Sequence, residues 1–244
     1  MIPAADEKLV AEGRHLMLAA GDRAEAPVAG WFDPAEWRRA GAVALETSGR
    51  GEVLIVAHGA ETWVLRHYRR GGLVARFIDD HYLWLGADRG RAFREWRLLR
   101  ELRAAGLPVP NPVAAHVYRT GFIYTADIIT SYLPNTRKLS WFIAQGRFPT
   151  GCWRQVGAMI AAVHRHGVDH PDLTAHNVLL DETGKCFLVD FDNAQRKPPG
   201  DWSRLGIERF NRSLRKVALE TGTEFDYAAW AEVLAGYTAR DAAT

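Results

Sequence analysis

Three polar residues, Asp172, Asn177 and Asp190, constrain this chain more than any other feature of its sequence. Asp172 and Asn177 lie five residues apart, in a segment whose His, Pro and Asp residues do not suit a regular helix. The apolar runs at residues 178–180 and 186–189 predict two short strands with a turn between them, and Asp190 ends the second strand. We therefore expect a loop, a hairpin and a strand end to bring two carboxylates and an amide together.

This combination of side chains is typical of phosphoryl transfer with a divalent metal ion. One carboxylate is needed to receive or orient the proton of a hydroxyl group. A second carboxylate and an amide oxygen are the kind of ligands that hard cations such as Mg²⁺ prefer. The stretch from His170 to Asp192 therefore predicts a site that handles phosphate groups.

The composition fits an ordinary soluble globular protein. The chain has 244 residues, of which 48% are apolar and 25% charged, so it can bury a core as one two-lobed domain or two small domains. The formal net charge of +2 does not suggest nucleic-acid binding. Most basic residues are Arg, which favours bidentate contacts with phosphate, although a GC-rich genome would produce the same bias.

The cysteines and the N-terminus bear on the location of the protein. Cys152 and Cys186 do not form a disulfide framework, so we expect a reducing compartment. The N-terminal residues contain Asp6 and Glu7 and no apolar segment, so they do not predict a signal peptide. No run of about 18 apolar residues occurs, and we therefore expect no transmembrane segment.

The order of the predicted elements divides the chain into three parts. Residues 1–30 are expected to form an N-terminal appendage, with an amphipathic helix over residues 5–19. Residues 31–129 contain mostly strands and one main helix over residues 91–105, and residues 130–244 are mostly helical. This order predicts an α+β fold of two lobes, in which an antiparallel sheet lobe with one main helix precedes a mostly helical lobe.

Two short motifs in the sheet lobe have both a functional and a structural interpretation. Gly49 and Gly51 lie in a turn between predicted strands, where backbone N–H groups can approach a phosphate, but most such glycine pairs only form hairpins. The basic residues from Arg66 to Arg70 precede Gly71 and Gly72. They could bind a polyanion, or they could discourage aggregation at an edge strand.

The order and spacing of these motifs resemble those of the protein-kinase-like fold. His170, Asp172 and Asn177 are similar to the catalytic loop of that family, in which His-x-Asp is followed five residues later by Asn. Asp190-Phe191-Asp192 is similar to the metal-binding Asp-Phe-Gly motif. The resemblance extends to other elements of the sheet lobe and to the connection between lobes: Gly49 and Gly51 for the Gly-rich hairpin, Glu95 for the helix Glu, and residues 129–134 for the hinge.

More narrowly, the chain resembles the 3-deoxy-D-manno-octulosonic acid (Kdo) kinases, which modify the inner core of lipopolysaccharide. This similarity covers residues 30–240 and includes residues 65–72 and 212–216. It implies ATP-dependent phosphorylation of Kdo, at the 4-hydroxyl in that family, on a lipid A precursor. The protein would then act in peripheral contact with the cytoplasmic face of the bacterial inner membrane, without nucleic acid or an obligate protein partner.

The resemblance also implies a role for each residue. Asp172 would be the catalytic base, Asn177 and Asp190 would bind Mg²⁺, and His170 would hold the loop. Arg66 would pair with Glu95 and bind phosphate oxygens. The residues expected to bind Mg-ATP are Gly49, Gly51, Arg66, Glu95, Asn177 and Asp190. The alternatives are a turn Asp at position 172 and an exposed helix Glu at position 95.

Several departures from the protein-kinase pattern bear on the acceptor. No Lys occurs between residues 9 and 137, so Arg66 is the best substitute for the small-lobe Lys of protein kinases. Pro171 follows His170 where protein kinases have Arg, and Asp192 replaces the Gly of Asp-Phe-Gly. These differences argue against a protein substrate and favour a sugar or another small molecule.

Other functions remain open at this point. Another lipopolysaccharide-core kinase acting on heptose, an aminoglycoside-type phosphotransferase, and a non-catalytic kinase-like binding protein share parts of the pattern. A zinc site is a weaker alternative, because the histidines lack the spacing of a His-Glu-x-x-His motif. The histidines concerned are His164, His166, His170 and His176.

Overall fold

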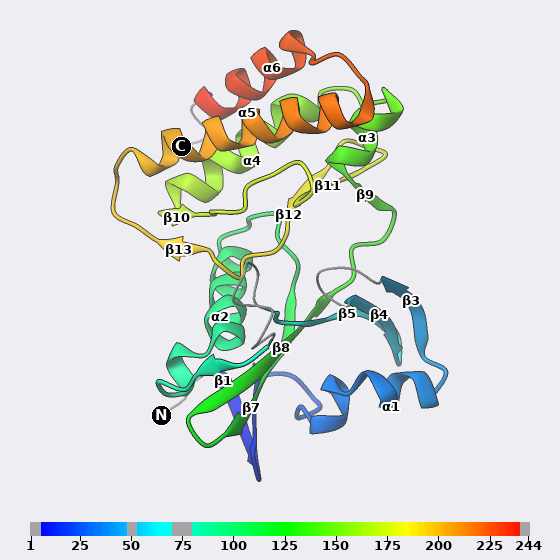
Figure 1. Cartoon of the computed structure of the whole chain (residues 1–244), viewed down its shortest axis with the longest axis vertical. Coiled ribbons are helices and arrows are strands. Elements are labelled where there is room, and N and C mark those ends of the chain that lie inside the picture. Colours follow the sequence, from blue (N-terminus) through cyan, green and yellow to red (C-terminus); the bar gives the residue numbers. More distant parts are fainter. Residues whose placement is uncertain (1–5, 48–52, 70–79, 240–244) are drawn as a thin grey trace. The chain divides into compact units, whose positions relative to one another are not determined.

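The computed structural model describes residues 6–47, 53–69 and 80–239 (Figure 1). The chain forms two compact units. Unit 1 comprises residues 1–100 and 111–132, and unit 2 comprises residues 101–110 and 133–244. The predicted α+β composition is confirmed, because unit 1 contains an antiparallel sheet and unit 2 is mostly helical.

Unit 1 is built on one large antiparallel sheet. Its strands are hydrogen-bonded in the order β1-β2-β7-β8-β5-β4-β3, and β6 pairs with β8. The bounds are β1 (Glu7–Glu12), β2 (His15–Ala20), β3 (Val43–Thr47), β4 (Val53–His58), β5 (Glu61–His67), β6 (Tyr82–Leu83), β7 (Pro112–Thr120) and β8 (Ile123–Ser131).

The N-terminal residues form strands, so the prediction of a helix over residues 5–19 was wrong. Gly13, in the left-handed region at φ 58°, makes a turn that separates β1 from β2. β2 then pairs with β7, which makes this hairpin part of the sheet instead of an appendage. The apolar residues of β2 are buried in an almost continuous run, and such a run has no period that separates a strand from a helix.

Helical segments lie on both faces of the unit 1 sheet. The segment η1 (Ala29–Phe32) and α1 (Pro34–Arg39) packs its aromatic residues against one face, where Trp63 and Leu65 of β5 are buried. The next residue of β5, Arg66, points to the opposite face and reaches Glu95 of α2 (Arg91–Ala104). α1 and α2 therefore cover opposite faces of the sheet (Figure 1), and η3 (Ala87–Arg89) precedes α2.

Residues 133–239 of unit 2 form four helices and short strands that carry the polar loop. The helices are α3 (Leu139–Gln145), α4 (Cys152–Arg165), α5 (Trp202–Thr221) and α6 (Tyr227–Thr238). β9 (Thr136–Lys138), β11 (Val178–Asp181) and β12 (Cys186–Leu188) form one small sheet, and β10 (Val168–Asp169) pairs with β13 (Gln195–Arg196). No helix within the described ranges is long and apolar enough to cross a membrane.

α4 and α6 approach each other through a pair of glycines. A Cβ atom added at Gly157 of α4 would lie 2.0 Å from the carbonyl oxygen of Val233. A Cβ atom at Gly236 of α6 would lie 2.0 Å from the carbonyl oxygen of Arg154. Both distances are far below van der Waals contact, so the two helix backbones can pack at this spacing only because neither residue has a side chain.

Candidate active site

The loop that carries Asp172 is fixed by hydrogen bonds to its own residues and to two helices of unit 2. The Asn177 side chain donates from Nδ2 to the carbonyl oxygen of Asp172 at 2.8 Å. Ala175 N–H donates to Ser213 Oγ of α5 at 3.0 Å, and Ser140 N–H of α3 donates to the Ala175 carbonyl at 3.1 Å. The loop is therefore anchored to α3 and α5 at Ala175, three residues after Asp172.

The carboxylate of Asp172 is exposed and has one oxygen engaged. Asn193 donates from Nδ2 to Asp172 Oδ2 at 3.0 Å. This contact fixes the rotation of the carboxylate group and leaves Oδ1 in position to accept a proton from a hydroxyl group. Asn193 was not predicted as a site residue from the sequence, although it directly follows the motif Asp190-Phe191-Asp192.

Asp190 lies where β12 ends, one residue beyond a backbone contact with the loop. Val189 N–H donates to the Asn177 carbonyl at 2.9 Å, which fastens this strand end to the loop. Asp190 itself has φ 67°, a left-handed conformation that a non-glycine residue adopts at a cost of about 1 kcal/mol or more. The structure thus brings Asp172, Asn177 and Asp190 together in unit 2, as the motif spacing predicted.

His170 is buried below the loop and takes no part in the exposed site. Its Nε2 donates to the Val189 carbonyl at 3.2 Å, and its ring meets that of Phe191 edge-on with centroids 4.9 Å apart. Burial lowers the pKa of His170, so the ring is neutral at pH 7 and Nδ1 carries no proton. His170 therefore joins the loop to the strand end instead of carrying a proton to substrate.

In unit 1, Arg66 and Glu95 form the ion pair that the resemblance implied. Arg66 Nη2 lies 2.5 Å from both oxygens of Glu95, whose side chain is only 2% exposed. Tyr68 donates from its hydroxyl to Glu95 Oε2, and Arg66 Cζ lies 5.0 Å from the centroid of the Tyr68 ring. Glu95 is therefore a buried acceptor that orients Arg66, and the alternative of an exposed helix Glu is wrong.

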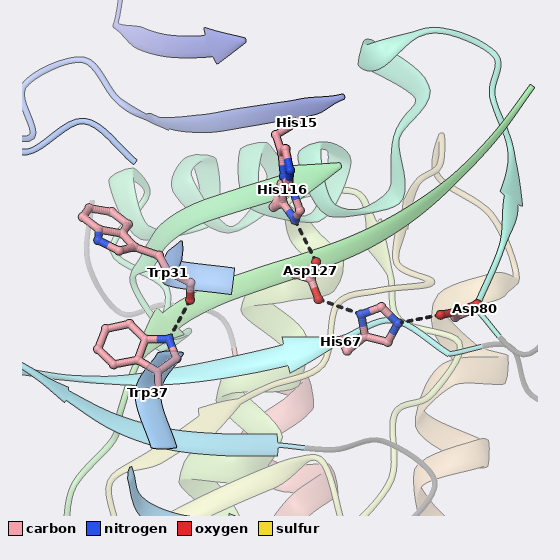
Figure 2. Close-up of polar contacts among 7 residues, drawn as sticks. All are labelled: His15, Trp31, Trp37, His67, Asp80, His116 and Asp127. Atoms are coloured by element: carbon pink, nitrogen blue, oxygen red, sulfur yellow. Dashed lines mark hydrogen bonds and ion pairs between the residues drawn. The ribbon is translucent and has the colours of Figure 1, made fainter. Parts of the chain in front are cut away.

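A chain of histidine and aspartate side chains crosses the other face of this sheet (Figure 2). His15 Nδ1 lies 2.9 Å from His116 Nε2, and His116 Nδ1 lies 2.8 Å from Asp127 Oδ2. Asp127 Oδ1 lies 2.6 Å from His67 Nδ1, and His67 Nε2 lies 3.3 Å from Asp80 Oδ2. The chain therefore links β2, β7, β8 and β5, and it places His67 between two carboxylates directly after Arg66.

The contacts along this chain shift the pKa values of its members in different directions. Hydrogen bonding to Asp127 raises the pKa of His67 despite partial burial. Burial alone would raise the pKa of Asp127, but hydrogen bonds from His116 and His67 outweigh it and lower that pKa. Burial and the neighbouring His116 lower the pKa of His15. His67 therefore keeps its proton to higher pH than an isolated histidine and faces a carboxylate that stays ionised to lower pH than an isolated aspartate, whereas His15 loses its proton more readily.

We expect His67→Gln to destabilise the protein more at pH 5.5 than at pH 9. The raised pKa of His67 means that its pairing with Asp127 contributes fully below its unfolded value of 6.5, and that this contribution is lost as pH rises through the folded pKa. The difference in free energy of unfolding between the two pH values should be about 1 kcal/mol or more. Urea unfolding measures it, with exposed His176→Gln as the control; an equal loss at both pH values would contradict the assignment.

The four histidines considered for zinc have separate surroundings. His164 Nδ1 pairs with the Tyr237 hydroxyl at 2.8 Å, and burial lowers its pKa to about 4. His166 Nδ1 donates to the Ala162 carbonyl at 3.1 Å, His170 is bonded as described above, and His176 is exposed. Within the described ranges, no group of three or more His, Cys, Asp or Glu side chains could hold a metal ion.

Comparison with known protein families bears on the alternatives that the sequence left open. Residues 35–237 match the model of the lipopolysaccharide kinase (Kdo/WaaP) family. The chain belongs to this family. Membership confirms the resemblance and the kinase-like α+β fold, and it makes the protein a phosphotransferase that acts on a hydroxyl group with ATP as the expected donor.

Three curated relatives are similar over most of this chain, and each is a 3-deoxy-D-manno-octulosonic acid kinase. The protein of Vibrio parahaemolyticus serotype O3:K6 (strain RIMD 2210633) is 36% identical over 206 residues, which cover 83% of this chain and 87% of the relative. That of Xylella fastidiosa (strain 9a5c) is 42% identical over 199 residues, covering 81% and 79%. That of Stenotrophomonas maltophilia (strain K279a) is 41% identical over 197 residues, covering 80% and 78%.

The structure describes one of the two motifs shared with the Kdo kinases in full and the other only in part. Ser213, in the motif at residues 212–216, is the residue that receives the Ala175 N–H bond and so supports the Asp172 loop from α5. Gly49 and Gly51 lie outside the described residues, as do residues 70–72 of the other motif. Their predicted contacts with phosphate stay predictions.

Proposed function

We propose that this kinase transfers the γ-phosphoryl group of ATP to a hydroxyl of Kdo, the 4-hydroxyl, on a lipid A precursor. The main support is the arrangement of Asp172, Asn177 and Asp190 on one fastened loop and strand end. The curated relatives, which are named as kinases of this sugar, support the choice of acceptor. We further propose that the protein works in peripheral contact with the cytoplasmic face of the inner membrane.

In this proposal, Asp172 orients the acceptor hydroxyl and receives its proton as the new O–P bond forms. Its exposed carboxylate is accessible to a sugar, and Asn193 keeps Oδ2 in place while Oδ1 accepts the proton. Because the backbone of the loop is already fixed, this carboxylate loses less conformational freedom when the substrate binds. The proton is then released to solvent from the exposed side chain.

The oxygen ligands in unit 2 suit Mg²⁺. Asp190 supplies a carboxylate, and Asn177, whose Nδ2 donates to the Asp172 carbonyl, presents Oδ1 as its ligand atom. Mg²⁺ bound there would neutralise charge on the phosphates of ATP. The left-handed backbone of Asp190 fits a position whose side-chain direction matters more than local stability. Asp192 is a further candidate ligand in the same motif.

We propose that Arg66 of unit 1 and the turn predicted at Gly49–Gly51 contribute to binding of the phosphates. Arg66 is permanently charged, and its guanidinium group can bond Glu95 and phosphate oxygens at the same time. The turn would supply backbone N–H groups, as its two glycines suggest. Arg66 would thereby take the place of the Lys that protein kinases use.

The acceptor is tested by incubating the protein with Mg-ATP and a Kdo-bearing lipid A precursor. The expected product has the mass of the acceptor plus one phosphate group, and fragmentation places that group on Kdo. A heptose-bearing acceptor serves as the parallel substrate. Phosphate on heptose alone would move the protein to another lipopolysaccharide-core activity, and no transfer to either acceptor would favour a non-catalytic kinase-like binding protein.

We expect Arg66→Ala to raise the KM for ATP at least about tenfold, because a charged hydrogen bond to phosphate is worth about 1.5–3 kcal/mol. Arg66→Lys should recover part of this loss, since Lys keeps the charge but not the planar pair of donors. The measurement is the initial rate against ATP concentration, with exposed Arg103→Ala as the control. Unchanged ATP kinetics in both Arg66 variants would assign phosphate binding to another residue.

A further inference from the structure

Unit 1 carries a cluster of exposed apolar side chains where β6 meets the turn between β7 and β8. Leu83 is 61% exposed, Leu85 is 58% exposed and Phe122 is 82% exposed. Leu83 pairs with Ile123 in the sheet, and Trp84 N–H donates to the Phe122 carbonyl at 2.8 Å. We call this cluster the tip patch, and its members are Leu83, Trp84, Leu85, Phe122 and Ile123.

Part of the tip patch adjoins packed aromatic residues. The ring centroid of Tyr124 lies 5.8 Å from that of Trp84 and 5.5 Å from that of Tyr82, with which Tyr124 is paired in the sheet. Leu83 and Ile123 form the next pair and point to the other face, so the tip presents apolar side chains on both faces. Tyr82 and Tyr124 are buried, while the outer apolar residues are not. The fold therefore holds a group of large apolar side chains toward solvent, and such clusters mark surfaces that bind a partner.

The charges at the tip patch favour an anionic partner. Arg119 Cζ lies 5.1 Å from the Trp84 ring, and the carbonyl of exposed Arg14 accepts a hydrogen bond from Arg119 N–H at 2.9 Å. Arg91 Cζ lies 4.8 Å from the Tyr82 ring. Asp80 contacts His67 and His81, and Asp88 contacts Arg97. Glu12, which is paired with His15 across the turn that contains Arg14, is the acidic residue that offsets part of this positive charge.

We propose that the tip patch inserts into the interface of a lipid bilayer that contains anionic lipids. Leu, Phe and Trp side chains with Arg beside them are typical of surfaces that bind at the level of the headgroups. The positively charged Arg side chains are attracted to the bilayer by its negative surface potential. This inference deepens the proposed function, on which it rests, because a lipid A precursor presents its sugar at such an interface.

The position of the tip patch within unit 1 agrees with that role. Arg66 pairs with Ile128 of β8, and Tyr82 of β6 pairs with Tyr124 of the same strand. Ile128 and Tyr124 are four residues apart, or about 13 Å along a strand. The proposed phosphate-binding residue thus lies near the end of the sheet that would contact lipid.

Vesicle flotation without nucleotide tests this surface apart from catalysis. The wild-type protein is expected to bind vesicles of phosphatidylcholine and phosphatidylglycerol in equal parts, and to bind pure phosphatidylcholine more weakly. Leu83→Ser combined with Phe122→Ser should reduce binding about tenfold or more, since each exposed apolar side chain adds buried area in the bilayer. Arg119→Glu should abolish the preference for phosphatidylglycerol, as should high salt.

Two matched variants and a soluble acceptor provide the controls. Leu219 in unit 2 is also 82% exposed, so Leu219→Ser should bind vesicles like the wild type. Arg147→Glu makes the same charge change at an exposed position of unit 2. The double variant should phosphorylate free Kdo at the wild-type rate and vesicle-borne acceptor more slowly, because the tip patch contains none of the residues proposed for phosphate transfer.

Two results would overturn the proposal: a wild-type protein that does not bind the anionic vesicles, or a double variant that binds them as tightly as the wild type. Capture of a protein partner by the tip patch without vesicle binding would count in the same way. The proposed function fails separately, through the absence of phosphate transfer to Kdo in a protein that still binds vesicles.

Discussion

Asp172→Asn is expected to reduce turnover about 10²- to 10⁴-fold, the range for loss of a general base. Affinity for Mg-ATP should remain near the wild-type value. The substitution keeps the shape of the side chain and an oxygen that can accept from Asn193, and Asn177 still reaches a backbone carbonyl. The loop should therefore keep its conformation. Single-turnover kinetics and nucleotide titration measure the two effects separately.

Asp190→Ala provides the contrast, because it should weaken Mg-ATP binding as well as turnover. Exposed Asp201 in the same unit is the control; its side chain makes no capping bond to α5, so Asp201→Asn should behave like the wild type. Full turnover in both the Asp172 and the Asp190 variants would show that the reaction takes place elsewhere on the protein.

Gly157→Ala and Gly236→Ala should each destabilise unit 2 by about 3 kcal/mol or more, because each new methyl group would meet a backbone carbonyl of the facing helix. In an open helix the same change would stabilise by about 1 kcal/mol, so the expected sign is opposite to helix propensity. Ala231→Gly, at an exposed position of α6, measures that propensity term alone. Thermal unfolding compares the variants, and stabilisation by either alanine would contradict the close approach of α4 and α6.

The part of the site that could be predicted from the sequence is local. Asp172, Asn177 and Asp190 lie within one loop and hairpin, so their spacing along the chain largely determines their spacing in the structure. The supports of this loop are not local. Ser213 lies 38 residues beyond Ala175, and no pattern in either segment indicates that these two residues meet.

The sheet shows the same limit more strongly. His15 and His116 are 101 residues apart and meet only because β2 is the neighbour of β7. His67 meets Asp127 because β8 has β5 as its neighbour on the side opposite β7. Strand order and register set these contacts, and neither can be read from hydrophobic periodicity. The contacts of the buried His116 and Asp127 were therefore found only in the structure.

The glycines of α4 and α6 lie between these cases. A glycine within a helical pattern indicates a close approach of another backbone, so Gly157 and Gly236 carried a signal. The identity of the facing helix was not part of that signal. Residues 7–20 also carried one, since Gly13 interrupts the apolar pattern there, and a turn at that residue would have predicted the hairpin.

The N-terminal hairpin belongs to the folded sheet but lies outside the region that matches the family model. The family match begins at residue 35, yet β2 supplies hydrogen-bond partners to β7 along five paired positions. A chain shortened to the matched region would present the backbone N–H and C=O groups of β7 as an open edge, able to recruit a strand from another molecule. The hairpin thus covers the edge of β7. A recombinant version of the protein should therefore include β1 and β2 instead of beginning where the family match begins.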